Sequence, residues 1–366
     1  MLHEKLVPSP ARALALAAAI ALPAATQAAP GYPYRVTELL PFAPGQGSGV
    51  ASLINNRGLV CGSMAGPVQS FCWYRGTLTP LLPLPGDETA VALGLNDLNQ
   101  VVGRSYGLDK PDHAVIFVGG QARPLAVASH PNSAAADINN LGQVVGALSD
   151  VPGDWYAFAS SHGTVRQLGE LGGPRHLGGA SAINDLGQIV GAVSAPNTSP
   201  LAADTVAFLY QHGVMRALPT PAGYRSSAAR INLLGQAVGV IQQIGGGDVS
   251  TWRAVLWQNG ARRTLVDVPS EARGLNNLGQ VVGATYEQEG GFLYTPGQGA
   301  RNLNTLIDPA SGYRIVYPQD INDLSQIVGY ACKAALCGPV LLSPWYLPVA
   351  TGGAAGDAGV MREGER

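Results

Sequence analysis

The residues most able to carry chemistry in this sequence are its four cysteines. Cys61 and Cys72 fall on neighbouring predicted strands, and Cys332 and Cys337 flank the equivalent connection near the end of the chain. An even number of cysteines in an exported chain favours disulfide bonds. A zinc site would need histidines nearby, and neither pair has one. We therefore expect the bonds Cys61–Cys72 and Cys332–Cys337, and no metal.

Two other patterns resemble chemical sites but are better explained as turns. Gly103-Arg-Ser105-Tyr-Gly107 has the spacing of a hydrolase nucleophile elbow, but no helical pattern follows it. Asn-Asp pairs such as Asn184-Asp185 lack the alternating oxygen ligands of a calcium loop. The sequence contains no phosphate-binding loop and no dinucleotide fingerprint, so we expect no cofactor.

Aromatic and charged residues stand side by side in several connections of variable length. Such combinations suit the binding of a polar ligand, for example a glycan, or of a protein partner. The candidate ligand-binding residues are Tyr106, Asp109, Asp112, His113, Asp154, Trp155, Arg175, His176, Tyr224, Arg225, Trp252, Tyr313 and Arg314.

The amino-acid composition favours one class of fold and argues against one class of binding partner. Charged residues make up only 13% of the 366-residue chain, which contains 48 Gly and 27 Pro. This composition favours many short strands and tight turns. The net charge is −2 and no basic stripe is visible, so we do not expect binding to nucleic acid.

The first 28 residues have the three parts of a secretory signal: positive charges, a short apolar stretch and small residues before the cleavage point. We expect cleavage after Ala28. The apolar stretch is far shorter than the roughly 20 residues that cross a bilayer, and no later segment is long enough. The mature chain is therefore expected to be extracellular or periplasmic, without a membrane span.

A nine-residue segment recurs seven times, as in Ile-Asn-Asn-Leu-Gly-Gln-Val-Val-Gly at residues 138–146. The copies lie 41 to 48 residues apart, which is the length of one four-stranded propeller blade. Asn and Gly suit a tight hairpin, since Asn bonds its own backbone and Gly accepts positive φ. We interpret the repeated asparagines as turn formers. They are Asn55, Asn96, Asn139, Asn184, Asn232, Asn276 and Asn322.

Each hairpin is followed by an apolar third strand, and in the first six units also by a fourth strand. This pattern predicts an all-β, seven-bladed β-propeller over residues 29–349, with the seventh unit lacking a clear fourth strand. Residues 34–39 resemble a fourth strand but precede the first hairpin, so we expect this N-terminal strand to complete the last blade and close the ring. The alternative is that residues 345–349 supply the missing strand. The Gly/Ala-rich tail, residues 350–366, is expected to be disordered.

This hairpin and the strand that follows it resemble the HAF-repeat family of bacterial extracellular proteins, named for a His-Ala-Phe segment at the third strand. Only His113-Ala114 keeps the histidine here; other units carry Tyr156, Val206, Arg253 or Gly290. The resemblance implies export and a repeated β architecture over about residues 34–345. It implies no reaction.

Loop lengths indicate where the function lies. The turns between first and second strands are all short, so we expect them to form a compact rim with no room for a site. The variable connections leave the opposite face, where we place the binding site of a monomeric binding or interaction module. The alternative is an enzyme acting on a polysaccharide, with Asp109, Asp112 and Asp154 as acid and base. A third possibility is a purely structural surface protein.

Overall fold

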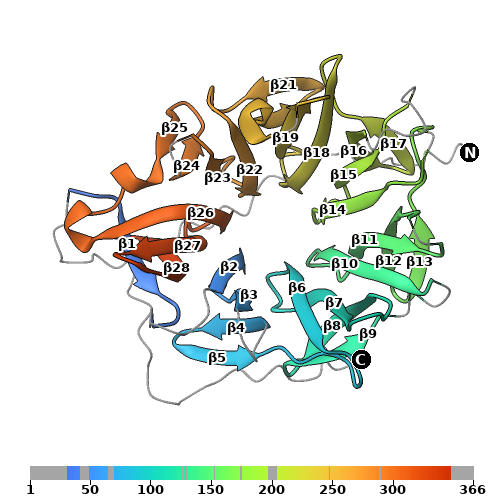
Figure 1. The fold of residues 1–366 in the computed structure, drawn as a ribbon, viewed down its shortest axis with the longest axis horizontal. Helices are drawn as coiled ribbons and strands as arrows, with labels where there is room; N and C mark the ends of the chain where they lie inside the picture. The colour runs from blue at the N-terminus through green and yellow to red at the C-terminus, as the bar shows by residue number, and fades with distance from the viewer. Residues whose placement is uncertain are drawn as a thin grey trace, which may run out of the picture.

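The computed structural model describes residues 31–41, 49–64, 70–125, 127, 130–151, 153–173, 175–196, 204–246, 248–287 and 290–347. The predicted signal peptide (residues 1–28) and the predicted disordered tail (residues 350–366) lie outside the described residues. Seven four-stranded antiparallel sheets follow one another around a central axis (Figure 1). The prediction of a seven-bladed β-propeller is confirmed.

We number the blades 1 to 7 from the first hairpin motif. Blade 1 contains β2 (Gly49–Ile54), β3 (Val60–Met64), β4 (Ser70–Tyr74) and β5 (Thr77–Pro80). Blade 2 contains β6 (Thr89–Leu95), β7 (Val101–Tyr106), β8 (His113–Val118) and β9 (Gln121–Pro124). Blade 3 contains β10 (Asn132–Ile138), β11 (Val144–Ser149), β12 (Tyr156–Ser161) and β13 (Thr164–Gln167). Blade 4 contains β14 (Gly179–Ile183), β15 (Ile189–Ser194), β16 (Thr205–Gln211) and β17 (Val214–Ala217).

Blade 5 contains β18 (Tyr224–Ile231), β19 (Ala237–Gln243), β20 (Arg253–Gln258) and β21 (Ala261–Thr264). Blade 6 contains β22 (Ser270–Leu275), β23 (Val281–Thr285), β24 (Gly290–Thr295) and β25 (Gly299–Asn302). Blade 7 contains β26 (Tyr313–Ile321), β27 (Ile327–Lys333), β28 (Leu336–Pro344) and β1 (Tyr34–Glu38). Three short 3-10 helices, η1 (Val249–Thr251), η2 (Leu303–Thr305) and η3 (Pro309–Ser311), lie in connections.

The N-terminal strand closes the ring. β1 pairs antiparallel with β28, from Tyr34 opposite Pro344 to Glu38 opposite Val340. In Figure 1 the first strand of the chain therefore lies against the last blade. The alternative, a strand at 345–349, is wrong within the described residues, because β28 ends at Pro344 and residues 345–347 form a turn. Closure leaves blade 7 with a complete outer strand.

The apolar core lies between neighbouring blades. Between blades 4 and 5, for example, Val190 and Ala207 pack with Val255 and Trp257. The first strand of each blade faces the axis (Figure 1) and carries a β-bulge near its end. The bulge brings a carbonyl group against the last glycine of the hairpin motif, so that a Cβ on Gly239 would overlap the carbonyl of Ser227. The final glycine of the motif therefore accommodates the bulged inner strand.

Two faces follow from this topology. The turns between first and second strands leave one end of the ring, which we call the hairpin face. The connections between second and third strands, and from blade to blade, leave the other end, which we call the loop face.

Candidate functional site

The repeated asparagines form turns, as predicted, and they also join the blades. The Oδ1 atom of Asn184 accepts hydrogen bonds from the main-chain N–H groups of Leu186 at 3.1 Å and Gln188 at 3.0 Å. Gly187 takes a positive φ of 73° in the same turn. The Nδ2 group of Asn184 donates to the main-chain oxygen of Asn232 in the next blade, at 2.9 Å. One side chain thus shapes its own hairpin and holds the adjacent one.

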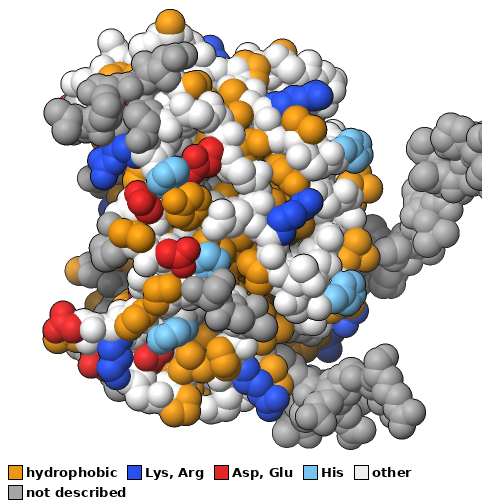
Figure 2. Space-filling view, turned by 90° about the vertical axis from the view of Figure 1, so that its right-hand side faces the viewer, with side chains coloured by type: hydrophobic (Ala, Val, Ile, Leu, Met, Phe, Trp, Pro, Cys, Tyr) orange, Lys and Arg blue, Asp and Glu red, His pale blue; other side chains and the backbone are white. Residues whose placement is uncertain are grey.

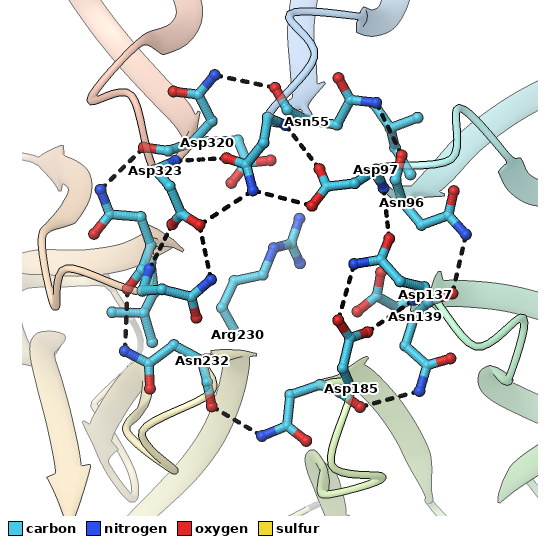
Figure 3. Close-up of a pocket in the computed structure, with 18 of the residues that line it drawn as sticks. Asn55, Asn96, Asp97, Asp137, Asn139, Asp185, Arg230, Asn232, Asp320 and Asp323 are labelled. Atoms are coloured by element: carbon cyan, nitrogen blue, oxygen red, sulfur yellow. Dashed lines mark hydrogen bonds between the residues drawn. The ribbon is translucent and has the colours of Figure 1, made fainter. Parts of the chain in front are cut away.

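The same inter-blade bond occurs at all seven junctions, so the hairpins form a closed ring (Figure 3). The asparagines are 3–5% exposed, and buried amides must be hydrogen-bonded. The sequence predicted the turn role. It did not reveal the ring, because each acceptor lies one full repeat away.

A second set of bonds surrounds the first at the residue after each asparagine. Asp97 accepts from the main-chain N–H of Asn56 at 2.8 Å and from its Nδ2 group at 3.0 Å. Asn and Asp alternate around this set, with amides donating to carboxylates, until Leu233 interrupts it. Strict alternation is impossible on a ring of seven, and Leu233 occupies the position where it fails. The members in ring order are Asn56, Asp97, Asn140, Asp185, Leu233, Asn277 and Asp323.

The ring surrounds an open pocket of about 300 Å³ on the hairpin face. The expectation of a compact rim with no room for a site is therefore wrong. Seven hairpins that bond side by side around an axis leave its centre open. In four blades the residue before the motif isoleucine lines this pocket. In blades 3, 5 and 7 these residues are Asp137, Arg230 and Asp320.

The charged residues alternate with small ones because neighbouring inner strands approach closely. A Cβ on Gly94 would lie 2.5 Å from the Cα of Asp137, and one on Gly274 would lie 2.8 Å from the Cα of Asp320. Asp137 accepts from the main-chain N–H of Ile183 at 2.9 Å. This carboxylate therefore joins blade 3 to blade 4, and Asp320 joins blade 7 to blade 1 in the same way through Ile54.

Electrostatics in the pocket are set by burial and by one cation. Burial raises the pKa of Asp137 to about 6, although Arg230 and two main-chain N–H groups act in the opposite direction. Burial also raises the pKa of Asp320, again opposed by Arg230. Figure 3 shows Arg230 reaching into the centre of the ring. Its Nη1 group donates to the main-chain oxygen of Ala229, at 3.1 Å.

Sequence reasoning missed Asp137, Arg230 and Asp320. A signal was present, since each directly precedes a motif isoleucine where three other repeats have glycine or alanine. Its meaning depends on the convergence of inner strands, which the sequence alone does not show.

On the loop face, the structure brings several predicted residues together in blade 3. Trp155 is joined to the segment leading into blade 4, since its N–H donates to the oxygen of His176 at 2.6 Å. The His176 ring lies 4.9 Å from that of Tyr156, and its Nδ1 atom pairs with Glu170. Glu170 and Asp154 contribute to a raised pKa of His176, with the Glu170 hydrogen bond as the largest cause. We call Asp154, Trp155, Tyr156, Glu170 and His176 the blade 3 patch.

Histidine–carboxylate neighbours recur along this side of the molecule. His130 pairs with Asp150, and His113 lies 3.5 Å from Asp87. Figure 2 shows histidine and acidic side chains next to one another at several places on the flank where blades 3 and 4 lie.

In blade 2, two of the predicted residues, Tyr106 and Asp112, contact the same arginine. Arg104 forms an ion pair with Asp112 at 2.9 Å and lies over the ring of Tyr106, 4.9 Å from its centre. Asp112 is thus engaged with a cation, which does not favour the role of a general acid. Asp109 is exposed in the adjoining turn with a positive φ of 57°.

The remaining predicted residues are distributed over the segment between blades 3 and 4 and over blades 5 and 7. Arg225 bonds Gln242, and Tyr224 packs at the edge of the core between blades 4 and 5. Trp252 meets Tyr286 edge to face at 5.9 Å. Tyr313 donates to Glu38 at 2.7 Å. Arg175 lies in the segment between blades 3 and 4, and Arg314 lies near the start of β26, opposite Cys332.

Both predicted disulfide bonds are present, Cys61–Cys72 and Cys332–Cys337. Each joins directly opposite residues on neighbouring strands. Among the described residues, no group of three or more His, Cys, Asp or Glu side chains is arranged to hold a metal ion. No helix in the described part of the chain is long and apolar enough to span a membrane.

Comparison with solved structures identifies the class of fold. The chain superposes on an inactive variant of virginiamycin B lyase from Staphylococcus aureus, solved with quinupristin, with a TM-score of 0.52. Identity is 11%, and the match covers 85% of this chain and 99% of the lyase. A streptogramin B lyase gives a TM-score of 0.51 at 10% identity, covering 85% of this chain and 98% of that one.

These similarities define the fold as a β-propeller and carry no activity across, because identity is near 10%. No protein-family model matches the sequence. No curated protein matches it either.

Proposed function

We propose that this protein is an exported binding module of the HAF-repeat type that recognises a glycan on its loop face. The observation that carries the proposal is the blade 3 patch, where two aromatic side chains stand beside two carboxylates and a histidine. Asp154, Trp155, Tyr156 and His176 are half-buried and Glu170 is exposed, so a ligand can reach the patch.

This combination matches the chemistry of a sugar. The C–H face of a pyranose ring packs on an aromatic ring, and its hydroxyl groups donate to carboxylates. Trp155 and Tyr156 supply the aromatic surfaces, and Asp154 and Glu170 supply the acceptors. The Glu170–His176 pair and the main-chain bond between Trp155 and His176 hold the patch in one arrangement before a ligand arrives. A site that is already ordered loses less conformational entropy on binding.

Export is supported by two features. The N-terminal segment has the composition of a secretory signal, and two disulfide bonds are compatible with an oxidising compartment. The HAF-repeat assignment rests on the hairpin and strand motifs described above.

A glycan array probed with the mature chain, starting at Ala29, tests the proposal. We expect binding to a limited set of glycans, and at least a tenfold weaker affinity for Trp155→Ala and Glu170→Gln. Tyr346→Ala provides the control, because Tyr346 is an exposed aromatic residue whose hydroxyl bonds a hairpin turn on the opposite face. An array without binding, or equal affinity of wild type and Trp155→Ala, would contradict the proposal.

A further inference from the structure

The hairpin face exposes a ring of leucines. In six blades the third residue of the turn, counted from the asparagine at its start, is leucine, with 40–68% of its surface exposed. We call this set the leucine crown: Leu98, Leu141, Leu186, Leu234, Leu278 and Leu324.

The turn itself does not require leucine. Only the main-chain N–H of this residue takes part, donating to the Oδ1 atom of the asparagine, as in Leu186 at 3.1 Å. In blade 1 the same position holds Arg57, which makes the same bond at 3.1 Å and is fully compatible with the turn. The exposed leucine side chains therefore need an explanation other than the hairpin.

The crown surrounds the pocket, because the inter-blade asparagine bonds hold the seven hairpin tips beside one another. Clustered exposed apolar side chains on a protein surface mark interaction sites, and here six leucines stand on hairpins around a polar pocket. The pocket at that centre contains five aspartates and one arginine. An incoming positive charge would be attracted to it and an incoming negative charge repelled.

We propose that the hairpin face docks a protein segment in which a lysine or arginine is flanked by apolar side chains. The cation enters the pocket near Asp137 and Asp320, and the apolar side chains cover the leucine crown. An anionic membrane fits less well, since its headgroups would meet the acidic pocket. A second copy of this chain would place two acidic pockets opposite each other. The site is independent of the proposed glycan site on the loop face.

Fluorescence anisotropy with three synthetic peptides tests the inference on the mature chain. The peptides have the sequence Gly-Ser-Leu-Phe-X-Leu-Phe-Ser-Gly, where X is lysine, norleucine or glutamate. We expect the lysine peptide to bind at least tenfold more tightly than the other two. Asp137→Asn with Asp320→Asn should remove that preference, since each amide keeps an oxygen for its main-chain donor.

A second variant combines Leu141→Ser, Leu186→Ser and Leu278→Ser. It should bind the lysine peptide at least tenfold more weakly than wild type, with a nearly unchanged melting temperature. The control combines Leu108→Ser with Val151→Ser, two exposed apolar residues in loop-face connections, and should bind like wild type.

Several results would overturn the inference. Equal binding of the three peptides, or no binding of any, would refute the proposed partner chemistry. Crown-dependent dimerisation in sedimentation velocity would assign the surface to a second copy. Crown-dependent flotation with phosphatidylglycerol vesicles would assign it to a membrane. None of these results bears on glycan binding, which is measured separately.

Discussion

Asn322 in the last blade donates its Nδ2–H to the main-chain oxygen of Asn55 in the first blade, at 3.0 Å, although 267 residues separate them. This bond closes the ring of hairpins at the axis, while the pairing of β1 with β28 closes blade 7 at the outside. The propeller thus has two closures, one formed by main chain and one by a side chain. Both join elements that are distant in sequence.

The inner closure should contribute measurably to stability. Asn322→Ala removes the bond to Asn55 and the two bonds from the turn N–H groups of Leu324 and Gln326. Loss of buried hydrogen bonds of this kind costs about 2–4 kcal/mol in total. Urea unfolding of the mature chain measures the change.

Asn302→Ala is the matched control, because Asn302 also caps a turn but is exposed and makes no bond to another hairpin. It should cost only about 1 kcal/mol. If the two variants are equally stable, the inter-blade bond contributes nothing.

Leu233 marks a position where stability can be gained. Leu233→Asn would offer an amide oxygen to the main-chain N–H of Asp185, as Asn140 does to that of Asp97 at 2.8 Å. Leu233 is 42% exposed, so little apolar burial is lost. We expect a gain of about 1 kcal/mol in the free energy of unfolding. Leu234→Asn, one residue along the same turn, should show no such gain. A destabilised Leu233→Asn would mean that the second set of bonds does not extend to blade 5.

Asp137 should make stability depend on pH. Burial raises its pKa to about 6 in the folded chain, above the value of about 3.9 for an unfolded aspartate. The folded state therefore binds the proton more tightly, so this contribution is fully present below pH 4 and is lost as the pH rises through 6. Its size is at most about 3 kcal/mol, and less where water enters the pocket.

The measurement compares unfolding free energies of wild type and Asp137→Asn from pH 4 to pH 8. Arg230 and Asp320 also face this carboxyl group and stay in both proteins, so the difference isolates Asp137. A difference that does not change with pH would contradict the shifted pKa.

Each disulfide closes a short loop, of sequence separation 11 for Cys61–Cys72 and 5 for Cys332–Cys337. Replacing either pair with alanine should cost about 2–3 kcal/mol, with the smaller effect for the shorter loop. Urea unfolding of the two double variants tests this. Four free thiols in the intact mass of protein recovered from an oxidising compartment would refute the bonds.

Substitutions on the two faces should separate stability from glycan binding. Gly187→Ala forces alanine into a positive φ of 73° and should cost about 1–2 kcal/mol without affecting affinity. Trp155→Ala should weaken glycan binding and leave the melting temperature within a few degrees of wild type. Trp252→Ala and Tyr313→Ala, in blades 5 and 7, lie outside the blade 3 patch and should keep the affinity, with some loss of stability because each contacts another side chain. Reversed results would place glycan recognition on the hairpin face.

The sequence by itself determined the blades, their number and their closure. A hairpin motif repeated at 41 to 48 residues is local information, since Asn184 and Gly187 define a turn within a few residues of themselves. The disulfides could also be predicted from the sequence, because the two cysteines of each pair lie within one repeat on adjacent strands. Residues 34–39 could be assigned to the last blade because their pattern matched a fourth strand.

Only the tertiary structure decided what the hairpins do together. The Nδ2 group of each asparagine finds its acceptor one blade away, and no local pattern specifies the angle at which blades meet. Asp137, Arg230 and Asp320 are at least 90 residues apart from one to the next, and they converge because the bulged inner strands turn toward a common axis. That axis stays open because seven hairpins bonded side by side form a ring, whose circumference is set by close packing between blades rather than by any single repeat.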